Sequence, residues 1–194
     1  MLQIFYKEKP IIISDKKSDL KLCLLIDVEL IENIDIINLL DKKNVNSIGI
    51  LSKNQKSILS AFEKKFPVIT AAGGKVLNQN SEILFIYRNK KWDLHKGKSE
   101  KNENISQTAL REVIEETGIK NLSIVKPLEK TYHIFKRKGK YYLKLTYWFE
   151  MISEYKGKFK PQKKEGITRV EWIGIENLHS ILPKSYANIR LLFT

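Results

Sequence analysis

The segment GKSEKNENISQTALREVIEETGI, at residues 97–119, is the most informative part of this 194-residue chain. Its second half predicts a helix over residues 105–117, because apolar residues recur there at helical spacing. They are Ala109, Leu110, Val113 and Ile114. Gly118 follows at the position where a left-handed residue commonly ends a helix. The apolar arc predicts that this helix packs against a sheet.

Three glutamates of the same helix, Glu112, Glu115 and Glu116, stand at positions i, i+3 and i+4. Their carboxylates project from neighbouring positions on one side of the helix and repel each other. We expect that Arg111 alone cannot neutralise them. A hard divalent cation among the oxygens would make the cluster favourable, and Mg²⁺ or Mn²⁺ is the natural candidate. A solvated acidic helix face is the alternative explanation of the three glutamates.

The complete segment resembles the signature of the Nudix hydrolases, Gly-x5-Glu-x7-Arg-Glu-U-x-Glu-Glu-x-Gly-U, in which U is an aliphatic residue. Every specified position is filled here, by Gly97, Glu103, Arg111, Glu112, Val113, Glu115, Glu116, Gly118 and Ile119. The resemblance covers roughly residues 67–194. It implies an α/β fold, in which a mixed sheet lies between helices in an α/β/α sandwich.

Family members hydrolyse compounds in which a diphosphate is linked to another moiety, and they use Mg²⁺ or Mn²⁺. The resemblance implies that Glu112 and Glu116 are the main metal ligands. Glu115 would be a further ligand or a base. The backbone carbonyl of Lys96 or Gly97 would complete the coordination shell.

The resemblance also implies roles for residues around these ligands. Arg111 would orient the glutamates, while Glu103 and Gly118 would support the structure of the motif. Glu165 lies in a segment, Lys164-Glu165-Gly166, that resembles the loop in which many members place one more acidic residue at the metals. It is therefore a candidate extra ligand or general base, with a plain surface glutamate as the alternative.

The lead-in WDLHKG, at residues 92–97, resembles the Trp-x-Leu-Pro-Lys-Gly of members that act on dinucleoside polyphosphates and related compounds. His95 stands where proline is usual. We expect a surface histidine that merely replaces the proline, and an imidazole near the phosphates is the alternative.

Four residues are candidate contacts to the substrate: Arg88, Lys96, Lys98 and Tyr142. The three cations precede the glutamate helix and could hold phosphates through charge-assisted hydrogen bonds. Tyr142 shares one face of a predicted strand with Trp148, and either ring could stack on a base. A solvated surface position is the alternative for the cations, and packing is the alternative for both rings.

Residues 1–66 predict a small N-terminal α/β domain in front of the Nudix domain at 67–194. Its predicted elements are a hairpin around Pro10, a buried strand at 21–26, helices over 34–40 and after Asn54, and a strand at 45–51. The second part predicts strands at 68–76, 83–87 and 170–173, a hairpin at 131–149 and a helix at 175–182. No chemical motif is recognisable in the first 66 residues. Their role could be to form a homodimer, to cover the cleft or to bind a regulator.

The sequence thus predicts a metal-dependent hydrolase that cleaves the pyrophosphate bond of a nucleoside diphosphate linked to another moiety. Metal-activated water would attack phosphorus, and Glu115 or Glu165 would accept the proton. A sensor that binds a nucleotide or diphosphate without turnover is one alternative, although the complete acid set argues against it. An enzyme for RNA 5′ ends is the other, without support from a ribonucleoprotein motif.

The composition is that of a globular protein, with a formal net charge of +13. This charge suits a polyanionic partner, but a biased Lys, Ile and Asn composition explains it equally well. The longest apolar run, residues 22–26, is far too short to span a membrane. The single cysteine, Cys23, and the lack of a secretory signal predict a cytoplasmic protein.

Overall fold

The computed structural model describes residues 1–27 and 35–193, which form two compact units. The first unit consists of Met1–Ile69 with Tyr132–Lys144, and the second consists of Thr70–Thr131 with Leu145–Thr194. The predicted hairpin at 131–149 therefore contributes to both units. The domain boundary predicted at residue 66 stays a prediction.

The first unit contains a mixed sheet with the strand order β10-β1-β2-β4-β3. Its strands are β1 (Leu2–Tyr6), β2 (Lys9–Ser14), β3 (Leu24–Leu25), β4 (Ile48–Leu51) and β10 (Thr131–Arg137). β1 and β2 form the expected antiparallel hairpin, whereas β1 pairs with β10 and β2 pairs with β4 in parallel. Ile4, Ile11 and Ile48 lie at paired positions of adjacent strands and are fully buried, so this unit has a core of its own.

Two helices of the first unit confirm the predictions for residues 34–40 and for the segment after Asn54. They are α1 (Ile36–Asp41) and α2 (Gln55–Lys65). Asp35 caps α1 and Asn54 caps α2, because each side chain accepts a hydrogen bond from the backbone N–H three residues further on. Ile34 lies outside the described residues.

The buried strand predicted at residues 21–26 is wrong. Only β3 is extended there, and Leu24 and Leu25 are 43% and 51% exposed. A 3-10 turn, Lys17–Leu20, comes before it and supplies the buried side chain of Leu20. β3 also lies at the end of the strand order, where a strand has a neighbour on one side only.

The second unit contains the sheet β12-β6-β5-β11, with β7 paired to β6, β8 to β5 and β9 to β11. The strands are β5 (Val68–Leu77), β6 (Ile83–Arg88), β7 (Lys91–Asp93), β8 (Lys96–Lys98), β9 (Leu122–Pro127), β11 (Lys140–Ser153) and β12 (Ile167–Ile173). β7, β8 and β9 were not predicted. They are short or mostly exposed, so their sequences have no strong apolar period.

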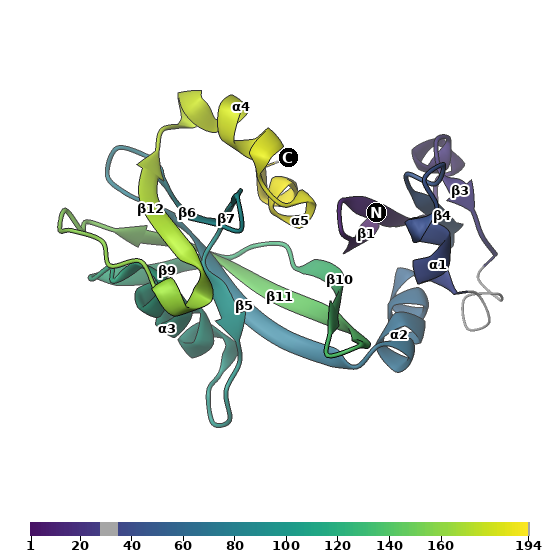
Figure 1. The fold of residues 1–194 in the computed structure, drawn as a ribbon, viewed down its shortest axis with the longest axis horizontal. Coiled ribbons are helices and arrows are strands. Elements are labelled where there is room, and N and C mark those ends of the chain that lie inside the picture. Colours follow the sequence, from purple (N-terminus) through teal and green to yellow (C-terminus); the bar gives the residue numbers. More distant parts are fainter. Residues whose placement is uncertain (28–34, 194) are drawn as a thin grey trace. The chain divides into compact units, whose positions relative to one another are not determined.

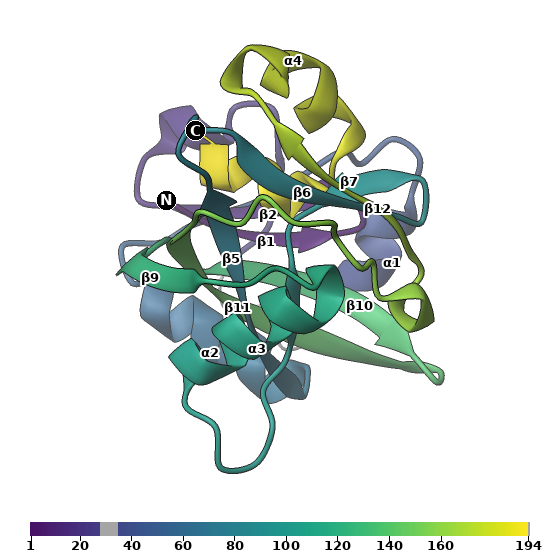
Figure 2. The ribbon, with the colours of Figure 1, turned by 90° about the vertical axis from the view of Figure 1, so that its left-hand side faces the viewer.

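Helices cover both faces of this sheet (Figures 1 and 2). α3 (Ile105–Thr117) packs its Ala109 and Val113 into a cluster with Leu84 and Ile86 of β6. The alternate β6 residues Ile83 and Phe85 face a second cluster, which contains Ile181 of α4 (Leu178–Ile181) and Ile189 of α5 (Ala187–Arg190). Strand alternation thus produces the predicted α/β/α sandwich with a mixed sheet.

The C-terminal region is more irregular than the helix predicted at 175–182. α4 is preceded by the 3-10 turn Ile175–Asn177 and followed by the 3-10 turn Leu182–Lys184, which contains Pro183. Pro183 has no backbone N–H to donate, so the α-helix cannot continue through it.

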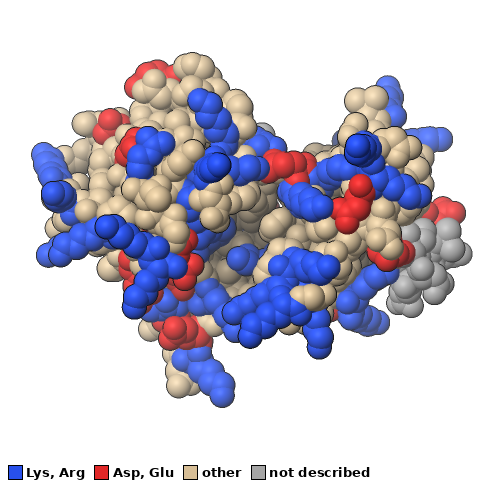
Figure 3. All heavy atoms as spheres, viewed as in Figure 1, with Lys and Arg blue, Asp and Glu red and all other residues tan. Residues whose placement is uncertain are grey.

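Lys and Arg side chains occur over both units on the face drawn in Figure 3, with acidic side chains among them. Charge alone therefore assigns no partner. No helix in residues 1–27 and 35–193 has the length and apolar character that crossing a bilayer requires.

α3 begins and ends at residues suited to those positions. Asn104 and Gln107 form a reciprocal capping box, in which each side chain accepts a hydrogen bond from the other's backbone N–H at 2.9 Å. Gly118 has a φ of 72° and donates its N–H to the Ile114 carbonyl at 2.7 Å, as a left-handed cap does.

We expect Asn104→Ala to lower the free energy of unfolding by about 1 kcal/mol, because the first turn of α3 loses its side-chain acceptor. Urea unfolding followed by circular dichroism measures the difference. Asn46→Ala, at an exposed position outside any helix, is the matched control and should change the stability little. Equal effects of the two substitutions would contradict a capping role.

Candidate active site

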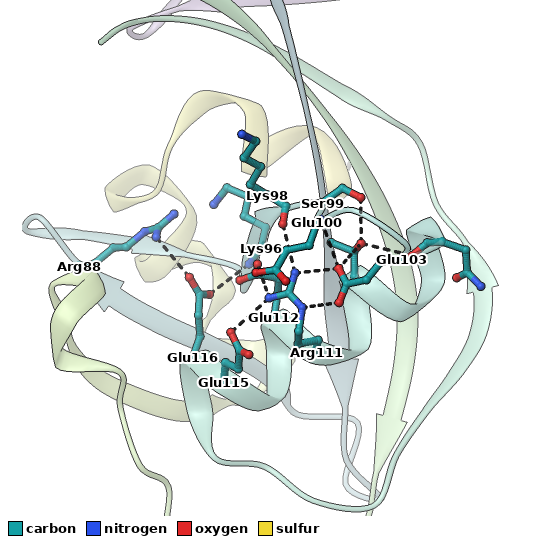
Figure 4. A network of polar contacts seen from close by, with 12 residues as sticks. Arg88, Lys96, Lys98, Ser99, Glu100, Glu103, Arg111, Glu112, Glu115 and Glu116 are labelled. Atoms are coloured by element: carbon teal, nitrogen blue, oxygen red, sulfur yellow. Dashed lines mark hydrogen bonds and ion pairs between the residues drawn. The ribbon is translucent and has the colours of Figure 1, made fainter. Parts of the chain in front are cut away.

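Arg111 on α3 joins three of the predicted glutamates (Figure 4). Its Nε donates to Glu103 at 2.6 Å, and its Nη1 donates to Glu112 at 2.8 Å and to Glu115 at 3.2 Å. Its Nη2 donates to the Lys98 carbonyl at 3.1 Å. The planar guanidinium thereby ties the helix to the loop that leads into it. Its hydrogen bond lowers the pKa of Glu103 to about 2.

As expected, Arg111 alone does not compensate the three glutamates, and a second cation of the protein pairs with the third. Arg111 contacts Glu112 and Glu115, while Arg88 on β6 donates to Glu116 at 3.4 Å. Each carboxylate thus has a cationic partner on the protein, because one guanidinium can serve several acceptors. Within the described residues, no group of three or more His, Cys, Asp or Glu side chains is gathered for metal binding.

Glu116 is the most buried of the three glutamates, at 1% exposure. Its Oε2 accepts a hydrogen bond from the Lys96 backbone N–H at 3.1 Å, and its Oε1 faces Arg88 (Figure 4). Burial raises the pKa of Glu116 to about 7, against the opposing effect of the positive charges of Arg88 and Lys96. A further positive charge beside this carboxylate would favour its ionised form.

Gly97 lies directly against the Glu112 carboxylate. A Cβ at position 97 would lie 2.0 Å from Glu112 Cδ, so any side chain there would displace the carboxylate. Burial raises the pKa of Glu112 although Arg111 lowers it, and the negative charge of Glu165 adds to the rise. Glu165, in the exposed 3-10 turn Lys163–Glu165, is therefore near enough to Glu112 for the two charges to interact.

Asp93 on β7, which was not predicted, lies beside the candidate site. It is 1% exposed, and both of its oxygens accept from Lys96 Nζ at 2.6 Å. Arg88 also donates to it, through Nε at 3.1 Å and Nη2 at 2.9 Å. Although burial alone would raise the pKa of Asp93, these two cations lower it. Arg88 and Lys96, which were predicted to bind phosphate, are therefore paired with Asp93 inside the second unit. The position of Asp93, three residues before Lys96 of the motif, was the sequence feature that could have indicated this pairing.

The expectation of a surface histidine at position 95 is wrong. His95 is fully buried, and neither ring nitrogen has a hydrogen-bond partner among the described residues. Burial lowers the pKa of His95 to about 3. Its carbonyl accepts from Gly74 N–H at 3.1 Å, and a Cβ at Gly73 would lie 2.0 Å from that carbonyl oxygen. Gly73 and Gly74 thus allow the two backbones to approach closely.

The remaining predicted residues are distributed between the two units. Lys98 exposes its side chain, next to the glutamate loop. Tyr142 belongs to the first unit, where its ring lies 5.8 Å from that of Phe135, and its contact with a substrate stays a prediction. Trp148 is fully buried and donates to Thr131 Oγ1 at 2.8 Å, which confirms the packing alternative for this ring.

The chemistry of the donors around α3 suits a hard divalent cation, although within the described residues their carboxylates do not converge on one point. Glu112, Glu115 and Glu116 supply carboxylate oxygens, and the Gly97 backbone lies against Glu112 with no side chain between them. Mg²⁺ and Mn²⁺ prefer oxygen ligands of this kind. Softer metals would favour thiolate or imidazole ligands, which this helix and loop do not carry.

The family model of the NUDIX domain matches residues 67–193, well over half of the chain. The chain belongs to the Nudix family. It is therefore a Nudix-type pyrophosphohydrolase, an enzyme that acts on acid anhydrides, and enzymes of this family generally use divalent metals.

This Nudix protein is similar to several solved structures. A MutT protein from Methanosarcina mazei Go1 has 23% identity and a TM-score of 0.50, with 66% of this chain and 92% of that chain covered. An Ap4A hydrolase from C. elegans has 20% identity and a TM-score of 0.46, with 59% and 86% covered. A bifunctional NMN adenylyltransferase/ADP ribose pyrophosphatase from Francisella tularensis has 17% identity and a TM-score of 0.49, with 74% and 46% covered. The first structure supports the shared fold.

We expect Asp93→Asn to lower the free energy of unfolding by about 3 kcal/mol, because loss of one partner leaves buried charges uncompensated. Urea unfolding measures this loss. Asp41→Asn is the matched control, since Asp41 pairs with Lys7 at 2.7 Å on the surface. An exposed pair contributes little to stability. Similar losses for the two variants would contradict the importance of the buried pair.

The buried imidazole of His95 predicts acid sensitivity. Below the ordinary pKa of 6.5 an unfolded histidine takes up a proton, which His95, with a pKa of about 3, does not bind in the folded protein. Lowering the pH from 7 to 5 should therefore reduce the free energy of unfolding by about 2 kcal/mol through this residue. Chemical unfolding at both pH values measures the reduction.

His95→Leu, with a side chain of similar size, should remove this contribution and lose less stability than the wild type between pH 7 and 5. His179→Leu removes an exposed imidazole and should keep the wild-type difference. If His95→Leu were as acid-sensitive as the wild type, this account of the buried ring would be wrong.

Proposed function

We propose that this Nudix enzyme uses Mg²⁺ or Mn²⁺ to cleave the pyrophosphate bond of a nucleoside diphosphate linked to another moiety. Dinucleoside polyphosphates, nucleotide sugars and similar compounds form this substrate class. The bond between phosphorus and the bridging oxygen breaks, and water supplies the new oxygen on phosphorus. A cytoplasmic location and a homodimer also stay proposals.

The observation that carries this proposal is the position of Glu116. Its carboxylate is buried between Arg88 and the Lys96 backbone, one helical turn from the Glu112 carboxylate against Gly97. Burial raises the pKa of Glu116, which disfavours its ionised form. A cation bound beside this carboxylate would stabilise the ionised form. A solvated acidic surface would leave this carboxylate in water instead.

We assign Glu112 and Glu116 as the main metal ligands, with the Gly97 carbonyl beside them. The bound dication would lower the pKa of the attacking water and offset charge on the leaving phosphate. Glu115 has a side chain that is 47% exposed and Glu165 lies in an exposed turn, so either can reach a water molecule as general base. Arg111 holds Glu112 and Glu115 in place.

Arg88, Lys96 and Lys98 are the proposed phosphate contacts, and they differ in availability. Lys98 is exposed, whereas Arg88 and Lys96 already bind Asp93. The Lys96 ammonium group has three N–H donors and already contacts three acceptors, the two Asp93 oxygens and the Leu94 carbonyl. A phosphate would therefore have to replace or share one of these acceptors. We therefore expect Lys98 to make the earlier contact with a polyphosphate chain.

A panel assay with Mg²⁺ and with Mn²⁺ tests the proposed substrate class. The panel contains dinucleoside polyphosphates, ADP-ribose, nucleotide sugars, coenzyme A, nucleoside triphosphates and 5′-triphosphorylated RNA. We expect metal-dependent release of phosphorylated products from one of the diphosphate-linked small molecules. Turnover of the RNA alone would favour the 5′-end enzyme, and binding without turnover of any compound would favour a sensor.

Glu115→Gln and Glu116→Gln should each lower kcat by at least about tenfold, because the substitutions remove a proton acceptor or a metal-ligand charge with little change in shape. Steady-state kinetics at saturating metal measures the effect. Glu63→Gln, at an exposed position of α2, is the matched control and should keep the wild-type kcat. Wild-type rates in both site variants would refute the role assigned to the glutamate helix.

A further inference from the structure

A second concave site lies within the second unit, beside the turn that joins β5 to β6. It is a cavity of about 310 Å³. Its walls combine three aromatic rings, two carboxylates and the amides of the turn. We call this cavity the aromatic pocket. Its rings and carboxylates belong to Glu82, Glu154, Tyr155, Phe159 and Trp172.

The three rings of the aromatic pocket form adjoining walls at steep angles. The centroids of Tyr155 and Phe159 lie 5.8 Å apart with an interplanar angle of 51°, and those of Phe159 and Trp172 lie 5.9 Å apart at 62°. All three side chains are half-buried, and the Tyr155 hydroxyl donates to the Lys158 carbonyl at 3.0 Å. The rings are therefore held by the fold and still border open space.

Two carboxylates border the same space. Glu82 accepts from Asn78 Nδ2 at 2.6 Å, and Glu154 accepts from Gln79 Nε2 at 3.0 Å, so neutral amides rather than cations hold them. Lys156 is the single basic residue among those lining the cavity. Two carboxylates against one ammonium group give the cavity a negative excess in a chain of net charge +13, and this excess favours a positively charged occupant.

The rings of the aromatic pocket also differ from other rings of this lysine-rich chain. Among the described residues a Lys or Arg lies over nine other rings, such as Lys75 over Phe193 at 4.4 Å and Lys130 over Tyr147 at 4.5 Å. In the described part of the chain, no Lys or Arg is placed over Tyr155, Phe159 or Trp172. Residues 1–27 and 35–193 thus place no cation on the π-faces of these three rings.

The aromatic pocket is distinct from the glutamate site. Glu82 comes directly before β6, whereas Arg88 is the last residue of that strand. Five residue steps at about 3.3 Å each separate the two ends of β6 by about 17 Å. The residues that line the cavity include none of the acids at the glutamate site, which are Glu112, Glu115, Glu116 and Glu165.

We propose that the aromatic pocket binds a small organic cation with a quaternary or substituted ammonium group. Such a cation is attracted by aromatic faces and, being bulky, loses less hydration than a primary ammonium ion. The carboxylates of Glu82 and Glu154 supply the opposite charge. A neutral molecule of the same shape would fill the same space without either electrostatic contribution.

Choline and its neutral isostere 3,3-dimethylbutan-1-ol are the matched probes. Titration of the full chain, followed through the indole N–H resonance of Trp172 in two-dimensional NMR, reports on the pocket itself. We expect saturable shifts with choline at millimolar concentrations, and binding of the neutral isostere at least about fivefold weaker. The resonances of Trp92 and Trp148, which lie outside the pocket, should not move.

Variants separate the contributions of ring and charge. Tyr155→Leu should weaken choline binding at least about threefold, whereas Tyr155→Phe keeps the π-face and should retain it. Glu154→Gln should weaken choline but not the isostere, and Glu63→Gln on α2 should change neither. Hydrolysis by Glu154→Gln without choline should equal that of the wild type, so failure of this proposal is distinguishable from failure of the active-site assignment.

Two results would overturn the proposal. The first is the absence of saturable shifts at Trp172 with choline. The second is equal affinity for choline and the isostere, which would reduce the aromatic pocket to an apolar cavity without selectivity for charge.

Discussion

Compensation of a buried negative charge is the interaction on which the site depends. Asp93 is removed from water, and a carboxylate there is stable only because Arg88 and Lys96 donate to it. The same two residues also hold Glu116, one through its guanidinium and the other through its backbone N–H. Strands β6, β7 and β8 and helix α3 are thus linked by one set of charges, which fixes the buried glutamate relative to the loop.

Close backbone approach is the second constraint, and it explains the glycines around the site. At Gly73 a Cβ would collide with the His95 carbonyl oxygen, and at Gly97 it would collide with the Glu112 carboxylate. The chain around His95 and Gly97 therefore lies against both β5 and α3 with no side chain between. This arrangement buries His95 and brings the Gly97 backbone against the Glu112 carboxylate.

The sequence predicted the glutamate helix and the fold class better than the burial of individual segments. The helix over 105–117, its cap at Gly118 and the α/β/α sandwich are confirmed, because spacing along one helix is a local property. The sequence wrongly predicted an exposed His95 and a buried strand at 21–26. The burial of these residues depends on which other segments lie next to them. The apolar pattern of the segment itself does not contain this information.

The sequence by itself determined the family, the positions of the glutamates on one helix and the class of metal that suits them, because residue type and helical period fix these properties. Tertiary structure decided the electrostatics. It buried Glu116 but left Glu115 exposed, brought Arg88 and Lys96 onto Asp93, and placed three rings around an acidic cavity at the other end of β6. Burial and charge pairing depend on distances between segments far apart in the chain, and only folding sets those distances.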